Sequence, residues 1–136
     1  KGMKDYLNKK VKFRENFRPF APIILENFQN KYFNSTEESP HMLYAIKAKK
    51  KFINKISATV HVDGTSRVQT VTKTSNTSLY NVLKEFYNIT SVPVLLNTSF
   101  NVKGQPIVDN PDSALKTFLK TKIDFLIMDK NLIIKT

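Results

Sequence analysis

The chain combines short apolar runs with longer stripes of apolar residues at helical spacing. The stripes predict amphipathic helices at residues 23–33, 76–90 and 110–121. The short runs predict strands, because a buried helix needs about 10 or more residues; these runs are residues 94–96, 123–128 and 132–134. Residues 42–48 indicate another strand, and residues 56–71 indicate two strand-like runs around an Asp63-Gly64 turn.

Strands mixed with helices place the chain in the α/β (α+β) class. Two predicted helices carry start signals. Thr77 or Ser78 is available as the N-cap of the first, and Asn110 caps the second with Pro111 at the first helical position. The last two apolar runs are separated by three polar residues, which favours a terminal hairpin.

Polar side chains gather directly after the predicted strand at residues 94–96. Asn97, Thr98, Ser99 and Asn101 follow one another there. In open α/β sheets ligands bind outside the carboxyl ends of strands, so this is where a small-molecule site is expected. The alternative is that these side chains only satisfy turn backbone, as Asn, Ser and Thr often do.

The segment from Val11 to Pro22 alternates cations with phenylalanines. If Val11 to Arg14 is extended, Lys12 and Arg14 share one face, because side chains alternate along a strand. Two cations on one face repel each other unless an anion lies between them, and Arg18 adds a third cation nearby. We favour a phosphate or carboxylate site, with pairing to Glu15 as the alternative.

Composition indicates one ordinary globular domain of 136 residues without cysteine. We expect no membrane span, because no apolar run is long enough, and no apolar signal segment near Lys1. The absence of cysteine favours a cytoplasmic protein. The start at Lys1 predicts a fragment of a longer protein. Residues 1–10 are expected to be a linker or helix tail, and residues 11–136 the domain.

A net charge of +11 attracts phosphate-bearing ligands or nucleic acid, and charge alone does not choose between them. His61 and Asp63 lie beside the predicted turn, and a metal site would need further ligands. A hydrogen-bonded structural histidine is therefore the default. Arg67 is a candidate anion ligand, with an ion pair to Asp63 as its alternative.

Several longer motifs occur together in one order. They are VKFRENFRPFAP, SPHM, HVDGTSRVQTV, VPVLLNTSFNVKGQPIV and NPDSALKTF. With these motifs the chain resembles the C-terminal domain of the nodulation and antibiotic-biosynthesis O-carbamoyltransferases. The resemblance implies a YrdC-like fold, a twisted mixed β-sheet flanked by helices, following a larger N-terminal domain of the actin-like ATPase superfamily.

The resemblance also implies an activity. The YrdC-like domain makes carbamoyl-adenylate from ATP, accompanied by Mg²⁺, and carbamoyl phosphate. The N-terminal domain, which holds iron or another metal, moves the carbamoyl group to an acceptor hydroxyl. YrdC-type enzymes use a Lys-x-Arg pair and a Ser-x-Asn pair around the nucleotide. The resemblance matches these pairs here with Lys12, Arg14, Ser99 and Asn101 as catalytic residues.

The remaining site residues are expected to bind substrate or nucleotide. Arg18 and Arg67 join Lys12 and Arg14 in offsetting anionic charge. Asp63 is a candidate for the neighbourhood of Mg²⁺, and His61 for orienting a substrate group. The rest of this set is Thr65, Asn97 and Thr98, and no metal ligand is expected in this chain.

Two positions depart from the family pattern. Ser91 stands where Gly is common, and Gln105 stands where Glu is usual. Ser91 reshapes a helix end, and Gln105 removes a charge near the proposed site. Two other functions compete with the adenylate-forming one: a basic RNA-binding module with a degenerate pocket, and a non-catalytic domain that docks on its transferase partner.

Overall fold

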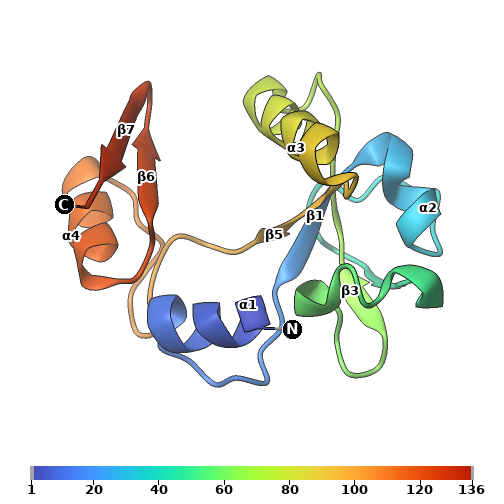
Figure 1. The fold of residues 1–136 in the computed structure, drawn as a ribbon, viewed down its shortest axis with the longest axis horizontal. Helices are drawn as coiled ribbons and strands as arrows, with labels where there is room; N and C mark the ends of the chain where they lie inside the picture. The colour runs from blue at the N-terminus through green and yellow to red at the C-terminus, as the bar shows by residue number, and fades with distance from the viewer. Residues whose placement is uncertain (1, 136) are drawn as a thin grey trace. The chain divides into compact units, whose positions relative to one another are not determined.

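A computed structural model describes residues 2–135 and confirms the α+β class (Figure 1). The chain divides into two compact units. The first runs to Arg18 and resumes at Ser99, and the second is Pro19–Thr98. Within residues 2–135, no helix combines the length and the apolar character needed to cross a bilayer.

A mixed three-stranded sheet forms the centre of the second unit. Strand β1 (Ala21–Leu25) pairs in parallel with β4 (Gln69–Val71) and antiparallel with β5 (Val94–Asn97). The strand predicted at residues 94–96 is therefore confirmed, and it lies at an edge of this sheet.

The helix predicted for residues 23–33 is wrong at its start, and the helical part is not one continuous α-helix. Its first residues belong to β1, followed by the 3-10 helix η2 (Glu26–Phe28) and a short helix α2 (Gln29–Tyr32). The central strand is buried on both faces, so its consecutive residues are all apolar. Such a run cannot be separated from a buried helix by periodicity.

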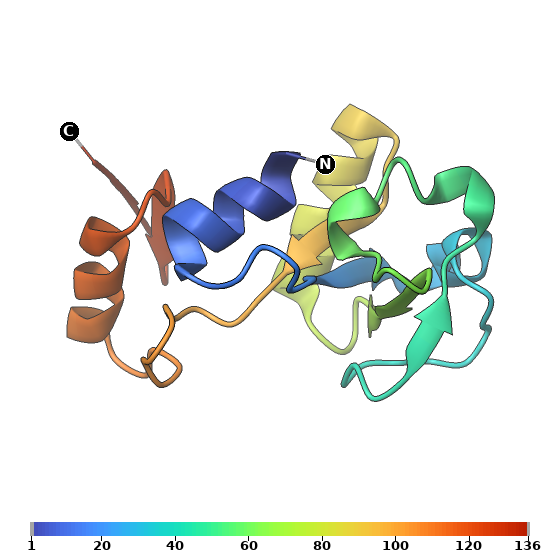
Figure 2. The ribbon, with the colours of Figure 1, turned by 90° about the horizontal axis from the view of Figure 1, so that it is seen from below.

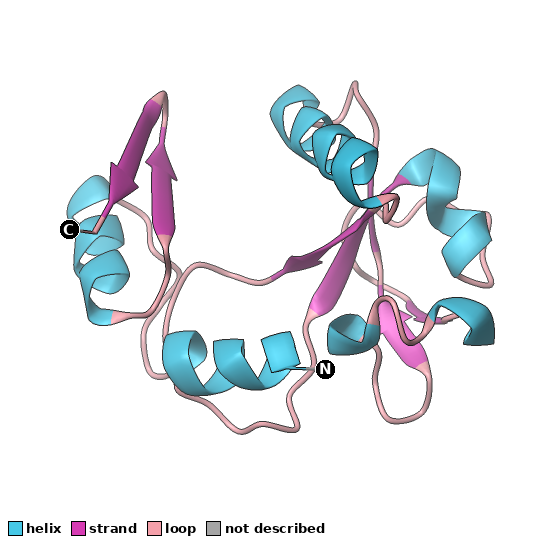
Figure 3. Ribbon diagram, in the orientation of Figure 1, coloured by secondary structure: helices cyan, strands magenta, loops and turns pink. Residues whose placement is uncertain are grey.

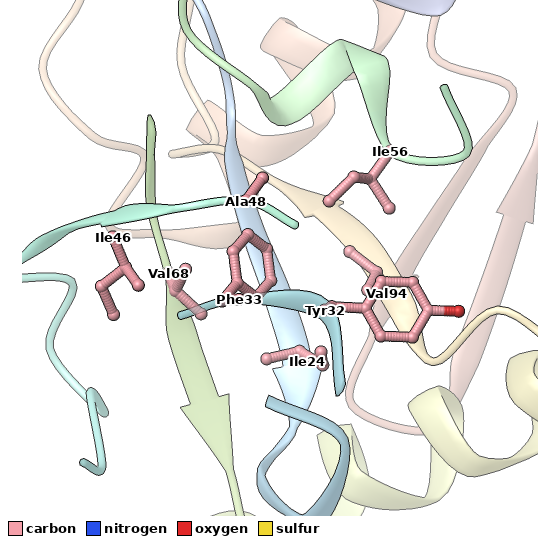
Figure 4. Packing of buried hydrophobic residues seen from close by; sticks show 8 residues of the cluster. All are labelled: Ile24, Tyr32, Phe33, Ile46, Ala48, Ile56, Val68 and Val94. Carbon is pink, nitrogen blue, oxygen red and sulfur yellow. The ribbon is translucent and has the colours of Figure 1, made fainter. Parts of the chain in front are cut away.

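Figure 4 shows the core on one face of β1, where Ile24, Phe33 and Val68 are fully buried and point toward one another. On the opposite face, Ile23 and Leu25 pack with Val71 of β4 and Leu83 of helix α3 (Thr77–Thr90). The two clusters use alternate residues of one strand, which fixes its register.

The outer part of the second unit is a short antiparallel pair, β2 (Ala45–Lys47) with β3 (Thr65–Arg67). The predicted strand upstream of Asp63-Gly64, from residue 56, is wrong, because the 3-10 helix η4 (Ser57–Thr59) and a turn occupy that segment. Another 3-10 helix, η3 (Lys50–Phe52), precedes it. The turn itself is confirmed, with Gly64 at φ 80°.

Helix α3 confirms the prediction for residues 76–90, with one correction at its start. The N-cap is Asn76, whose Oδ1 accepts a 3.0 Å hydrogen bond from the Leu79 N–H. Neither Thr77 nor Ser78 caps the helix, because both already lie inside it. At the other end Ser91 adopts φ 58°, the left-handed conformation that glycine prefers.

The first unit begins with helix α1 (Gly2–Tyr6), which runs directly into the π-helical turn η1 (Leu7–Lys12) (Figure 2). Helix α4 (Pro111–Lys120) has Asn110 as its N-cap, as predicted. Strands β6 (Phe125–Met128) and β7 (Asn131–Ile134) form the predicted hairpin (Figure 3). Phe118 and Ala114 of α4 pack against Leu126 of β6 to form the core of this unit.

Candidate functional site

Lys12 lies at the end of η1 and is only 4% exposed. Its Nζ donates to the Ser99 carbonyl oxygen at 2.8 Å and to the Asn101 carbonyl and Oδ1 oxygens at 2.7 Å each. An ammonium has three N–H donors, so these three acceptors use all of them. Burial, and then the neighbouring Arg14 charge, lower the pKa of Lys12 to about 8.

The expectation of an extended segment from Val11 to Arg14 is wrong. Lys12 ends a helical turn, and Phe13 then takes φ 51°. Because Phe13 is left-handed and not extended, Lys12 and Arg14 do not share one face as they would on a strand. Lys12 therefore turns inward toward the Ser99–Asn101 turn.

Ser99 and Asn101 are hydrogen-bonded to each other. The Ser99 hydroxyl donates to Asn101 Oδ1 at 2.7 Å, and the Asn101 amide donates to the Gln105 carbonyl oxygen at 2.9 Å. Asn101 Oδ1 thus accepts from both Ser99 and Lys12. The structure brings the predicted Lys-x-Arg and Ser-x-Asn pairs together within one unit.

Asn8 is a residue of this site that the sequence reasoning missed. Its side chain is fully buried; Oδ1 accepts a 2.8 Å hydrogen bond from Arg14 Nε, and Nδ2 donates to the Arg18 carbonyl oxygen at 2.9 Å. The Asn8 carbonyl also accepts from the Arg14 N–H. Asn8 precedes Lys12 by one helical turn in a segment expected to be a linker or helix tail, and that spacing was the available signal.

The loop after Phe13 and the turn after Ser99 line an open pocket of about 260 Å³. Gln105 lines it, and its side-chain oxygen accepts from the Val102 N–H. The remaining lining residues are Lys12, Arg14, Arg18, Ser99, Asn101, Val102, Lys103 and Gly104.

Four cations and one carboxylate set the charge around this pocket. Glu15 pairs with Lys103 at 2.7 Å and with Arg18 at 3.5 Å. The hydrogen bond from Lys103 is the main reason that the pKa of Glu15 falls to about 2. The excess of positive charge favours an anionic ligand, and arginine and lysine side chains suit phosphate oxygens.

The other predicted site residues lie in the second unit. His61 and Arg67 line a cavity of about 220 Å³ together with Pro19, Phe20, Ala21 and Met42. Arg67 Nε donates to the Met42 carbonyl oxygen at 3.1 Å, and within residues 2–135 no ion pair joins Arg67 to Asp63. That alternative for Arg67 is therefore not realised.

Thr65 connects His61 to Asp63. Its Oγ1 donates to Asp63 Oδ1 at 2.7 Å and lies 3.1 Å from His61 Nδ1. The hydrogen bonds from Thr65, side chain first and backbone second, lower the pKa of Asp63. Within residues 2–135 no three His, Asp or Glu side chains are grouped closely enough to hold a metal ion.

Asn97 ends β5, and its amide donates to Gln69 Oε1 of β4 at 2.6 Å. Asn97 therefore links the two outer strands of the sheet across β1. Thr98 is exposed immediately after the strand.

The sequence matches the Carbamoyltransferase C-terminus family over residues 1–135. The chain therefore belongs to this family of carbamoyltransferase C-terminal domains. It is 43% identical over 135 residues to the nodulation protein NolNO of Sinorhizobium fredii, covering 97% of this chain and 20% of that protein.

Two further relatives extend the comparison. The nodulation protein NolO of Bradyrhizobium diazoefficiens is 40% identical over 135 residues, which cover 97% of this chain and 25% of NolO. An uncharacterized protein of Methanocaldococcus jannaschii is 42% identical over 135 residues, covering 99% of this chain and 26% of that protein. The chain thus spans between a fifth and about a quarter of the length of these relatives.

Proposed function

We propose that this domain binds ATP and carbamoyl phosphate and forms carbamoyl-adenylate. The observation that carries the proposal is the polar pocket of the first unit, in which Lys12, Arg14 and Arg18 lie beside Ser99 and Asn101. Cations and hydroxyl or amide donors are the groups that bind phosphate oxygens. Membership of the carbamoyltransferase C-terminus family supports a carbamoyl donor as the second substrate.

The proposed reaction joins two anions. Water removes the phosphate of carbamoyl phosphate, and an oxygen of the resulting carbamate bonds to the α-phosphorus of ATP while the bond to pyrophosphate breaks. Repulsion between the reactants and the charge on departing pyrophosphate both oppose this step. Cations offset this repulsion and this charge most effectively when their positions are already fixed before the reaction begins.

The side chains of the pocket differ in what they offer a ligand. The three donors of Lys12 are held by Ser99 and Asn101, so Lys12 supplies charge and fixes the shape of the turn. Arg14 is oriented through its Nε by Asn8, and Arg18 lies at the exposed rim. We assign phosphate binding to these two arginines, and positioning to Ser99 and Asn101.

A titration of the chain with ATP and Mg²⁺, with and without carbamoyl phosphate, tests this function. Saturable heat of ATP binding that changes when carbamoyl phosphate is present, followed by pyrophosphate release, supports it. A chain that binds RNA with a steep salt dependence and gives no heat with millimolar ATP contradicts it and favours the RNA-binding alternative.

A second function, docking onto the rest of a longer transferase, is favoured by the outer face of the β6–β7 hairpin. Phe125 pairs with Ile134, and Ile127 with Leu132, and each of these four side chains is more than half exposed. Contiguous apolar patches of this kind mark interaction sites. Because the relatives are about four or five times longer than this chain, we assign the remainder of such a polypeptide as the occupant.

Amide hydrogen exchange tests the docking function. Slower exchange in β6 and β7 within the longer polypeptide than in this chain alone supports docking through this face. Equal exchange rates in the two contexts contradict it.

A further inference from the structure

The second unit has an open pocket of about 300 Å³ at the carboxyl ends of β1 and β4. These two strands are neighbours in the sheet and run in parallel, with Leu25 and Val71 as register partners at their ends. In open α/β sheets ligands bind outside such strand ends, and small-molecule sites occupy roughly 300–1,000 Å³. The lining residues are Glu26, Asn27, Val71, Thr72, Lys73 and Tyr80. They are different from those that line the pocket of the first unit and the cavity of His61 and Arg67.

The loop between β4 and α3, which carries Lys73, is held by hydrogen bonds within itself. The Thr72 carbonyl oxygen accepts from the Ser75 hydroxyl at 3.1 Å and from the Asn76 N–H at 3.3 Å. The Ser75 N–H donates to Thr72 Oγ1 at 3.0 Å. The Thr77 hydroxyl donates to the Lys73 carbonyl oxygen at 2.9 Å. The backbone of Lys73 is therefore fixed, and its side chain takes no part in fixing it.

The walls on either side of this loop are also anchored. Glu26 begins η2, and its carbonyl oxygen accepts from the Gln29 N–H. Tyr80 lies in the first turn of α3, and its side chain packs against the core cluster that contains Val71 and Leu83. A site whose walls are fixed before the ligand arrives loses less conformational freedom on binding.

Two opposite charges line this pocket without pairing. Within residues 2–135, neither the Glu26 carboxylate nor the Lys73 ammonium forms an ion pair or a side-chain hydrogen bond. Among the same residues, the Asn27 amide and the Tyr80 hydroxyl form no hydrogen bond. An ionised carboxylate only accepts and an ammonium only donates. The pocket therefore presents one anionic acceptor and one cationic donor that other protein groups do not occupy.

These two charges select the class of ligand. Lys73 disfavours a metal ion or another simple cation, and within the described part of the chain no three His, Asp or Glu side chains are grouped to hold one. Glu26 disfavours a phosphate or another simple anion. A molecule that carries both charges meets an opposite charge at each end, and hydrogen bonds between charged groups are the stronger kind.

We propose that this pocket binds a small zwitterion, a molecule that carries an ammonium group and a carboxylate. Glu26 accepts from the ammonium group, and Lys73 donates to the carboxylate. The Asn27 amide and the Tyr80 hydroxyl add hydrogen bonds to the same two groups. Val71 and the Tyr80 ring contact the carbon chain between them. The site is separate from the pocket assigned to ATP, and the inference does not rest on the proposed function.

Titration of the ¹⁵N-labelled chain, followed by NMR, tests the site with three matched probes. The first, γ-aminobutyrate, carries both charges, whereas butylamine carries only the ammonium group and butyrate only the carboxylate. The amide signals of Asn27, Thr72 and Lys73 should shift with γ-aminobutyrate. It should bind about three- to fivefold more tightly than either single-charge probe, a modest ratio because exposed ion pairs contribute little.

Two charge variants locate the binding. Glu26→Gln should lose the preference for γ-aminobutyrate over butyrate, because that preference depends on the ammonium group. Lys73→Met should lose the preference over butylamine, because that preference depends on the carboxylate. The matched controls, Glu85→Gln and Lys84→Met, remove the same charges from α3 outside the pocket and should bind like wild type.

Four results overturn the assignment. One is equal binding of the three probes by the wild type, and another is no shift of the Asn27, Thr72 and Lys73 signals with γ-aminobutyrate. A third is a set of shifts confined to residues 12–18 and 99–105, which would place the zwitterion in the pocket of the first unit. The fourth is a charge variant that keeps the preference it should lose. Because ATP binding is measured separately, none of these results decides the proposed function.

Discussion

Lys12 Nζ donates a 2.7 Å hydrogen bond to Asn101 Oδ1, joining residues 89 positions apart in the chain. The same oxygen accepts from the Ser99 hydroxyl at 2.7 Å. One amide oxygen thus connects the end of η1 to the turn that carries the Ser-x-Asn pair. Lys12 therefore holds the turn that forms one wall of the pocket of the first unit.

Lys12 should make the stability of the chain depend on pH above neutrality. Its pKa is about 8 in the folded state, against 10.5 for an ordinary lysine. Between these values the unfolded chain binds more protons, so the free energy of unfolding should rise with pH. The rise attributable to Lys12 should be at most about 3 kcal/mol. It is measured as the difference in urea unfolding between wild type and Lys12→Met, at pH 8 and at pH 10.5. A difference that does not change with pH contradicts the prediction.

Asn8→Leu should weaken ATP binding about 10-fold, although Asn8 does not line the pocket. The substitution keeps the branching of the side chain but releases Arg14 Nε and leaves the Arg18 carbonyl without its donor. Loss of buried hydrogen-bond partners should also lower the free energy of unfolding by about 1–3 kcal/mol. Calorimetry and urea unfolding measure the two effects. Asn88→Leu, at an exposed position of α3, is the control and should leave ATP affinity unchanged.

Glu15→Gln should strengthen ATP binding about two- to fivefold. The carboxylate pairs with Lys103 and Arg18, so its removal releases two cations toward the pocket and takes away one negative charge. Exposed ion pairs contribute little to stability, so the unfolding midpoint should scarcely move. The matched control is Glu85→Gln on α3. Weaker ATP binding by Glu15→Gln would contradict a role for Lys103 and Arg18 as phosphate ligands.

Ser91→Gly should stabilise the chain by roughly 1 kcal/mol, because a side chain in the left-handed region costs about that much. Ser91 has φ 58° directly after α3, where glycine is the favoured residue. Urea unfolding measures the gain. Ser78→Gly places the same change inside the helix and should destabilise by about 0.5–1 kcal/mol. Stabilisation by both variants would argue against the conformational explanation.

Local sequence signals were sufficient to predict the start of α4 and the terminal hairpin. Asn110 with Pro111 predicted the start of α4, and the apolar runs around Asp129 predicted the hairpin. Strand β1 was misread because burial on both faces removes the alternation that identifies a strand. Whether β1 is buried depends on which segments pack against its two faces. The local sequence of β1 does not specify those segments.

In the candidate site, too, sequence motifs identified some residues but not the contacts that the fold creates. Short motifs were enough to select Lys12, Arg14, Ser99 and Asn101. The inward direction of Lys12 depends on a left-handed Phe13 and on acceptors nearly 90 residues away, which no local pattern encodes. Asn8 was missed because its segment shows no apolar periodicity, and because its partners Arg14 and Arg18 lie in a loop whose path the sequence does not specify.

Calorimetric titration of ATP with Mg²⁺ into wild type, Arg14→Ala and Lys84→Ala tests the ATP pocket most directly. Lys84 is an exposed lysine of α3 and is not among the residues that line the pocket of the first unit, so its variant loses one positive charge but no lining side chain. The predicted result is that Arg14→Ala loses 10-fold or more in ATP affinity, about 1.4 kcal/mol or more, while Lys84→Ala binds like wild type. Equal affinity of wild type and Arg14→Ala would contradict the assignment of this pocket to ATP.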